Sequence, residues 1–95
     1  MGRIEVIKNT DKELIINIAD EDYTMGNLIA KLAEAKPEVV YSAYRIDHPL
    51  IPKLTLTIIT DGSRAPIEVL KEVLNDISRM AKEFQEKFKE ALNIE

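Results

Sequence analysis

The 95-residue sequence contains no cysteine and no tryptophan, and it has a single histidine. Without cysteine the chain can form no disulfide bond, thiolate nucleophile or cysteine-ligated metal site, a composition that suits a reducing compartment. Aromatic residues make up 5% of the chain, so rings on which nucleic-acid bases could stack are scarce. No apolar run approaches the ~20 residues of a membrane-spanning helix, and no signal peptide opens the sequence. We therefore expect a cytoplasmic protein without membrane association.

The charge balance argues against direct binding of nucleic acid. Asp and Glu total 17 against 13 Lys and Arg, which gives a net charge of −4. A nucleic-acid-binding domain instead presents a basic face that releases counterions from phosphates. Hydrophobic residues account for 45% and charged residues for 32% of the chain, a globular composition. We expect one domain, residues 1–95, with a small core.

The first half of the sequence predicts two strands and a helix. Residues 3–9 and 13–19 alternate in polarity around the turn-forming segment Asn9-Thr10-Asp11, a pattern that indicates a hairpin. Thr24 is the predicted N-cap of a helix of about three turns, because its hydroxyl can accept a backbone N–H. Pro37 ends this helix, since the residue before a proline avoids helical backbone angles.

The second half predicts two further strands and a long helix. Residues 39–47 are β-branched and aromatic and apolar on both faces, which predicts a buried central strand. Residues 48–52 contain two prolines and are predicted to be irregular, and residues 53–60 alternate cleanly as another strand. The order β-β-α-β-β-α predicts an α+β fold, a four-stranded, mainly antiparallel sheet with both helices on one face.

The long helix, residues 66–92, is the most informative element. Pro66 suits a first helical position, and at ~1.5 Å per residue the helix is about 40 Å long. A sheet of strands this short spans only about 20–30 Å, so the end of the helix extends into water unless another chain covers it. Apolar residues three and four apart form its seam: Ile67, Leu70, Leu74, Ile77, Ala81, Phe84, Phe88 and Ala91. Such an exposed seam predicts a partner protein.

No catalytic constellation is visible, and we expect no catalytic residue, metal or cofactor. His48 adjoins Asp47, but neighbours on a strand point to opposite faces, and further ligands for a metal are not concentrated nearby. The acidic run of residues 20–22 is better explained by helix-dipole interaction and solvation. Gly26 has no glycine-rich surroundings of the kind that bind phosphate.

Three separated segments resemble a known family. They read DYTMGNLI from Asp22, AYRIDHPL from Ala43 and TDG from Thr60, and Pro66 then opens the long helix. In this order they are similar to the small alpha-like subunits of RNA polymerases, called subunit L in archaea, which have eukaryotic counterparts and share the fold of the bacterial alpha dimerisation domain. The family commonly has His and Leu where this chain has Tyr23 and Met25, substitutions that keep the character of each position.

The resemblance implies a non-catalytic subunit of a nucleotidyltransferase complex. It implies pairing with the larger alpha-like chain of the polymerase, named D in archaea, to form a platform on which the two large catalytic subunits assemble. The small zinc-bearing subunits N and P join the same platform. The catalytic aspartates and magnesium of the polymerase belong to the largest subunit, and nothing in this sequence matches them.

The resemblance also implies a set of partner-interface residues. In the first helix and the long helix they are Thr24, Gly26, Asn27, Leu28, Leu70, Leu74, Ile77, Ala81, Phe84 and Phe88. The segment from His48 to Pro52, with His48 and Pro49 at its start, is a second interface candidate. Gly26 is expected to let backbones of two chains approach closely, and Asn27 either bonds the partner backbone or extends the helix cap.

Two other functions remain as alternatives. A stand-alone homodimeric module that binds a small ligand would equally need a partner for its long helix, although no polar cluster suggests a ligand site. A small phosphate-processing enzyme would need a basic glycine-rich loop, for which Asp61-Gly62-Ser63-Arg64 is the nearest candidate.

Overall fold

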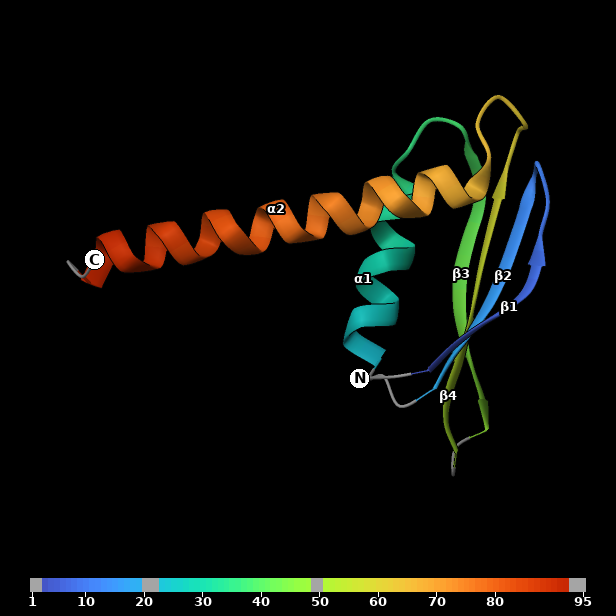
Figure 1. The fold of residues 1–95 in the computed structure, drawn as a ribbon, viewed down its shortest axis with the longest axis horizontal. Coiled ribbons are helices and arrows are strands. Elements are labelled where there is room, and N and C mark those ends of the chain that lie inside the picture. The colour runs from blue at the N-terminus through green and yellow to red at the C-terminus, as the bar shows by residue number, and fades with distance from the viewer. Residues whose placement is uncertain (1–2, 20–22, 49–50, 93–95) are drawn as a thin grey trace.

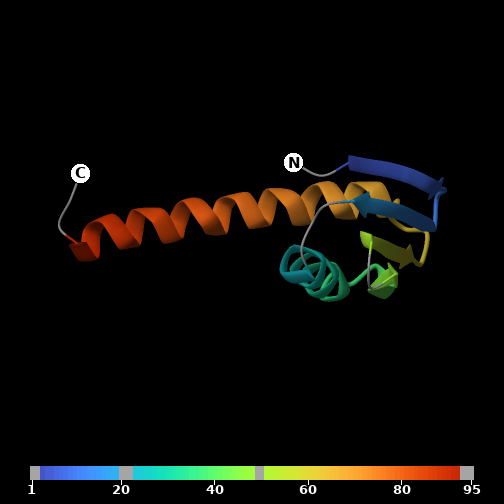
Figure 2. The ribbon, with the colours of Figure 1, turned by 90° about the horizontal axis from the view of Figure 1, so that it is seen from below.

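The computed structural model of the chain describes residues 3–19, 23–48 and 51–92, and it contains the six predicted elements in order (Figure 1). They are β1 (Arg3–Asn9), β2 (Glu13–Ala19), α1 (Tyr23–Glu34), β3 (Val39–His48), β4 (Ile51–Thr60) and α2 (Pro66–Leu92). The strands form one antiparallel sheet in the order β1-β2-β4-β3. Both helices lie on the same side of this sheet (Figures 1 and 2). The predicted α+β class and antiparallel sheet are therefore confirmed.

The β1–β2 hairpin closes where the turn chemistry predicts. The Thr10 N–H donates to the Glu13 carbonyl at 2.8 Å, and the Glu13 N–H donates to the Thr10 hydroxyl at 3.0 Å. The register shifts between Val6 and Lys8, so Ile7 is an extra residue in the edge strand. A bulge of this kind twists an edge strand and makes it a poorer template for pairing with other chains.

The prediction that residues 39–47 form a central strand is wrong. The central strands are β2 and β4, and β3 lies at an edge of the sheet. Val40 falls where the β3–β4 register shifts, and both Val40 and Tyr41 are exposed. The apolar residues on both faces of β3 therefore reflect a strand with one uncovered face and one open edge.

The irregular segment predicted at residues 48–52 is also wrong in extent. His48 pairs with Ile51, so β3 and β4 form a hairpin, and Pro49 and Leu50 between them lie outside the described residues. Pro52 belongs to β4. It is tolerated because the pairing of β4 with β2 stops at Lys53 and the β3 register is irregular opposite Pro52, a position where a missing N–H costs little.

Only the C-terminal end of α1 lies where the sequence predicts it. The helix begins at Tyr23, so Thr24 lies within its first turn and is not the N-cap, and the preceding residue lies outside the described residues. At the other end the Lys36 N–H donates to the Ala33 carbonyl at 3.0 Å, just before Pro37. The predicted stop at this proline is confirmed.

The core lies between the helices and the two central strands. Alternate residues of β2 and β4 point toward the helices, which follows from the two-residue period of a strand. The buried apolar set is Leu14, Ile16, Ile18, Ile29, Ala30, Ala33, Leu54, Leu56, Ile58, Val69, Leu70 and Val73. The Ser42 hydroxyl donates to the Ala30 carbonyl at 2.9 Å and ties the edge strand β3 to α1.

Candidate protein-interaction surface

Helix α2 is supported by the rest of the chain only near its beginning. Its buried residues are Pro66, Val69, Leu70 and Val73, and residues 78–92 are all exposed. Figures 1 and 2 show this second half projecting away from the sheet and from α1. The radius of gyration is 15.3 Å, against about 12 Å for a compact domain of this length. The predicted extension of the helix beyond the sheet is therefore confirmed.

The projecting half carries an apolar stripe that continues the core face of the helix. Three- and four-residue steps lead from buried Leu70 and Val73 along this face, and such residues lie above one another on a helix. We call these residues the α2 stripe: Leu74, Ile77, Met80, Ala81, Phe84, Phe88, Ala91 and Leu92. Ile77 is half-buried against the core, and the other members are exposed. The helix thus keeps the same apolar face after its own sheet has ended.

Two phenylalanines dominate the stripe. The rings of Phe84 and Phe88 stack with their centroids 6.0 Å apart and their planes at 17°. Phe84 is 71% exposed and Phe88 53%. Two stacked rings on a contiguous apolar surface form the kind of patch that marks a protein-interaction site.

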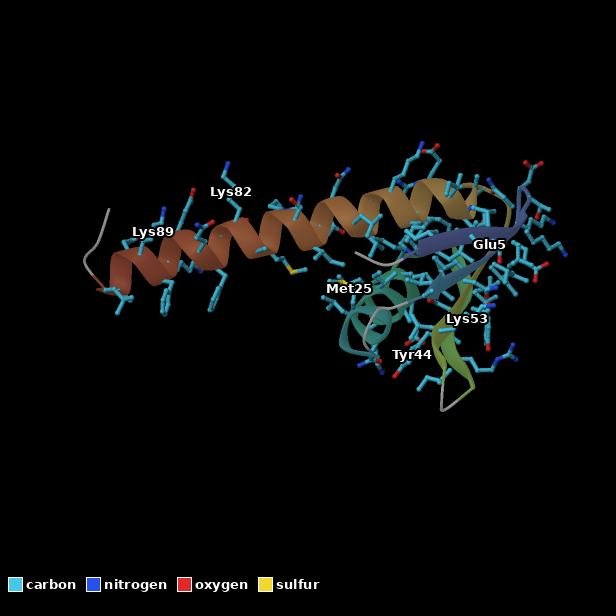
Figure 3. All side chains as sticks on the ribbon, turned by 60° about the horizontal axis from the view of Figure 1, so that its bottom comes forward. Glu5, Met25, Tyr44, Lys53, Lys82 and Lys89 are labelled. Atoms are coloured by element: carbon cyan, nitrogen blue, oxygen red, sulfur yellow. The ribbon has the colours of Figure 1, made fainter. Side chains whose placement is uncertain are left out.

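The other side of the projecting half is charged. Lys82 and Lys89 point away from the side of α2 on which α1 and Met25 lie (Figure 3). One helix therefore has a solvated face and an apolar face over its whole exposed length. This polarity gives a partner one defined side on which to pack.

The predicted interface residues differ in their exposure. Asn27, Leu28, Leu74, Ala81, Phe84 and Phe88 are exposed, and Ile77 is half-buried. Leu70 is buried in the core of the chain itself. The side chains of Thr24 and His48 and the whole of Pro49 lie outside what the structure describes.

The role assigned to Gly26 needs correction. Gly26 is buried, and a Cβ added to it would lie 2.9 Å from Leu54 Cδ1 and 3.6 Å from Tyr44 Cδ2. The close approach that this glycine permits is therefore to β4 and β3 of its own sheet. Nearby on α1, Met25 and Leu28 are further exposed apolar side chains.

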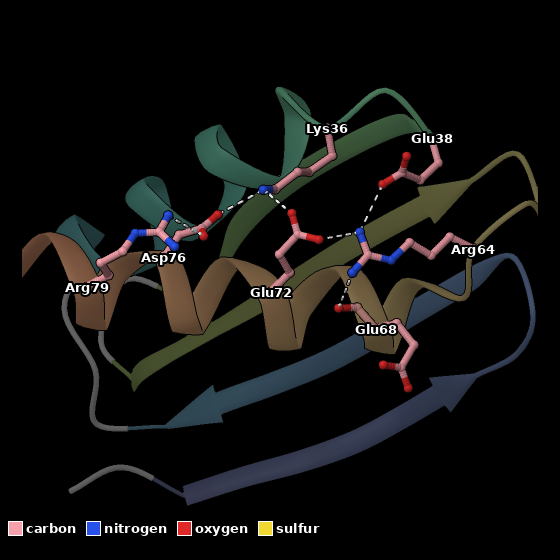
Figure 4. Close-up of polar contacts among 7 residues, drawn as sticks. All are labelled: Lys36, Glu38, Arg64, Glu68, Glu72, Asp76 and Arg79. Atoms are coloured by element: carbon pink, nitrogen blue, oxygen red, sulfur yellow. Dashed lines mark hydrogen bonds and ion pairs between the residues drawn. The ribbon is translucent and has the colours of Figure 1, made fainter.

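An ion-pair network holds the base of α2 against α1 (Figure 4). Lys36, in the turn after α1, donates to Asp76 Oδ2 at 2.8 Å and also pairs with Glu72. Arg79 bonds the other Asp76 oxygen at 2.9 Å. Bonds from Lys36 lower the pKa of both carboxyl groups, and the carboxylates raise the pKa of Lys36, with Asp76 as the larger cause.

Arg64 extends this network to the turn between β4 and α2. Its Nη1 lies 2.5 Å from Glu72 Oε1 and 3.2 Å from Glu38 Oε1. The pairing with Glu72 and then Glu38 raises the pKa of Arg64. Together with Lys36, this guanidinium fixes the direction in which α2 leaves the body.

The turn preceding α2 is shaped by local bonds within the segment considered for phosphate binding. The Ser63 N–H and hydroxyl donate to Asp61 Oδ1 at 2.8 and 2.6 Å, which lowers the pKa of Asp61. Gly62 has φ of +94°, a value that favours glycine. Because Arg64 forms ion pairs with two carboxylates, the side chains of this turn act to position α2.

The ion-pair network gave no signal in the sequence. Lys36 lies 36 and 40 residues from its two partners, so no helical or strand spacing connects them.

Among the described residues no group of three or more His, Asp or Glu side chains is placed to hold a metal ion. The acidic run at residues 20–22 lies outside the described residues. No helix formed by the described residues has the length and apolar character needed to cross a bilayer.

Comparisons with known proteins agree on one family. The profile of the RNA polymerase Rpb3/Rpb11 dimerisation domain matches residues 13–87. The chain is 35% identical over 92 residues to DNA-directed RNA polymerase subunit Rpo11 of Pyrococcus furiosus, covering 95% of this chain and 97% of that protein. It is 34% identical over 86 residues to Rpo11 of Saccharolobus shibatae, covering 90% and 94%. The crystal structure of DNA-directed RNA polymerase subunit L from Thermoplasma acidophilum has the same fold, with a TM-score of 0.86 at 16% identity, covering 98% of this chain and 91% of that one.

Proposed function

The chain belongs to the RNA polymerase Rpb3/Rpb11 dimerisation-domain family, and we propose that it pairs with the larger alpha-like polymerase subunit, the one named D in archaea. It is a small alpha-like subunit of a DNA-directed RNA polymerase. In the proposed role the heterodimer is the platform on which the two large catalytic subunits assemble, with subunits N and P on the same platform. The chain itself contributes no catalytic residue, and it acts with the polymerase in the cytoplasm.

The observation that carries this proposal is the uncovered α2 stripe. Phe84 and Phe88 continue the face that packs on the sheet near Val73, yet no part of the described chain covers them. Covering the exposed parts of both rings would remove on the order of 200 Å² of apolar surface from water. At ~25 cal/mol per Å² this is about 5 kcal/mol before the costs of association.

The geometry also supports a defined angle between the two subunits. Lys36 and Arg64 fix the base of α2 through Glu72 and Asp76, so the projecting half is presented in one direction. A helix that is already formed and oriented loses less entropy on binding than a flexible segment does. Met25 and Leu28 on α1 offer a second contact for the same partner.

The first test is affinity purification of the tagged chain from its native cells, with identification of the co-purifying proteins by mass spectrometry. We expect the larger alpha-like subunit together with the two large catalytic subunits. Recovery of the chain alone, from a lysate in which polymerase is present, would overturn the proposal. A homodimer in that eluate would support the alternative of a stand-alone regulatory module.

The platform role has its own test in reconstitution from purified subunits. Omission of this chain should leave the larger alpha-like subunit unable to gather the catalytic subunits into one complex, as measured by size-exclusion chromatography with light scattering. A complete complex formed without the chain would contradict the assembly role while leaving the pairing with the larger alpha-like subunit intact.

A further inference from the structure

The positions that flank the seam of α2 are almost free of charge. The seam through Leu74, Ala81 and Phe88 repeats every seven residues, which defines two flanking rows as in a coiled coil. Over residues 78–92 these rows consist of Ser78, Gln85 and Leu92 on one side and Met80 and Lys87 on the other. Lys87 is thus the single ionised side chain beside the seam over residues 78–92.

Lys87 lies directly next to the aromatic part of the α2 stripe. It follows Phe84 by three residues and precedes Ala91 by four, so on a helix it borders both. Lys87 is exposed and lines a shallow surface hollow with Glu90 and Ala91. Among the described residues it forms no ion pair, although Glu83 and Glu90 lie one turn before and after it.

From this arrangement we propose that the helix covering the α2 stripe belongs to an unlike chain and places a carboxylate opposite Lys87. This rests on the proposed pairing with the larger alpha-like subunit and adds the chemistry by which the seam selects its partner. Side chains that flank an apolar seam set partner choice through opposite charges across it. A second copy of this chain would offer no carboxylate at its own α2 flanks, where the charged residues are Lys71 and Lys87.

In the complex Lys87 is partly shielded from water, so its electrostatic interactions are stronger there than in the free chain. When Phe84 and Ala91 are covered, the Lys87 ammonium lies at the rim of the buried patch, where water is partly excluded. Opposite charges there attract more strongly than at an open surface, and like charges repel. The same attraction weakens with added salt, because the rim remains in contact with solvent.

The test compares three variants of the full chain in binding to the purified larger alpha-like subunit by isothermal titration calorimetry. Relative to wild type, we expect Lys87→Gln to raise Kd about two- to fivefold and Lys87→Glu about tenfold. The matched control, Lys89→Glu, makes the same charge change on the side of α2 opposite to that on which α1 lies (Figure 3) and should stay within about twofold. At about 0.5 M NaCl the difference between Lys87→Glu and Lys89→Glu should largely disappear.

The outcomes separate this inference from the proposed function. If Lys87→Glu and Lys89→Glu reduce the affinity equally while wild type binds normally, the carboxylate opposite Lys87 is refuted and the pairing itself stands. Failure of the wild-type chain to bind the larger alpha-like subunit would overturn the proposed pairing itself. Sedimentation of the isolated chain gives the third outcome, because self-association as strong as that binding would overturn selection of an unlike partner.

Discussion

Lys36 donates a 2.8 Å hydrogen bond to Asp76, and this bond connects the turn after α1 with the point at which α2 begins to leave the body. Both side chains are four-fifths shielded from solvent, with 19% of each exposed. The pair is therefore better placed than an open surface ion pair to fix an angle between helices. The position of the apolar stripe relative to α1 depends on this contact.

Acid should weaken the attachment of α2. Hydrogen bonds from Lys36 hold the pKa of Asp76 below its ordinary 3.8 and, with Arg64, that of Glu72 below 4.5. The ion pairs of these two carboxylates stabilise the fold fully at pH values above the ordinary pKa values. This stabilisation is lost as the pH falls through the lower pKa values of the folded state. Urea midpoints measured between neutral pH and about pH 3 should fall more steeply for wild type than for Lys36→Met. An identical acid slope in the two proteins would contradict the role of this network.

Substitution of the stacked phenylalanines should separate binding from folding. Because Phe84 and Phe88 touch no part of the core, Phe84→Ala and Phe88→Glu should leave the helical circular dichroism of the isolated chain largely unchanged. Each should weaken capture of the larger alpha-like subunit at least tenfold, since truncation of a buried aromatic at an interface typically costs ~2 kcal/mol or more. Lys82→Glu, on the charged face, is the control and should bind normally. Unchanged capture by both phenylalanine variants would refute the assignment of this surface.

Two leucines one turn apart on α2 should behave oppositely. Leu70 is 9% exposed and Leu74 is 47% exposed. Leu70→Ala should lower the free energy of unfolding of the isolated chain by about 3 kcal/mol, as for other buried leucines. Leu74→Ala should cost well under 1 kcal/mol there and should instead reduce affinity for the larger alpha-like subunit. Chemical denaturation and calorimetry on the two variants decide the matter, and equal destabilisation would place Leu74 in the core.

Gly26→Ala should destabilise the isolated chain although alanine favours helices. The new methyl group would meet Leu54 at 2.9 Å, and Leu54 is fixed in the core with 2% exposure. Overpacking costs ~1–3 kcal/mol and the gain in helix propensity is ~1 kcal/mol, so a net loss of about 1 kcal/mol is expected. In a Leu54→Val background the same substitution should cost less, because Leu54→Val removes the clashing atom. A cost that is unaffected by Leu54→Val would show that the strain lies elsewhere.

The part of the fold that depends on local spacing could be predicted from the sequence. The bounds of α2 follow from Pro66 at its first position and from a seam that persists to the end of the helix. The edge position of β3 could not be predicted, because its apolar residues do not specify which strand lies beside it. That choice is made by pairing between residues far apart in the chain, such as Ile16 with Leu56.

The apolar face of α2 could be predicted from the sequence, but not the point along that face at which the helix leaves its own sheet. The period of the seam is the same at Leu70 as at Phe88, yet the first packs on its own sheet and the second is exposed. The division depends on where the sheet ends beneath α2, which is a property of the folded chain. The sequence places Gly26 against a partner for the same reason, since a missing side chain does not reveal which side chains pack against it.

The strand order also determines when the chain can fold during its synthesis. β2 ends at Ala19, but β4, its second neighbour in the sheet, begins only at Ile51. The N-terminal hairpin therefore waits for most of the chain to be made before its inner face can be covered, and this long-range pairing is expected to be slow. Helix α2 is translated after β4, so the sheet can close before the α2 stripe has left the ribosome. The order of translation thus favours completion of the subunit's own core ahead of the exposure of the α2 stripe to other chains.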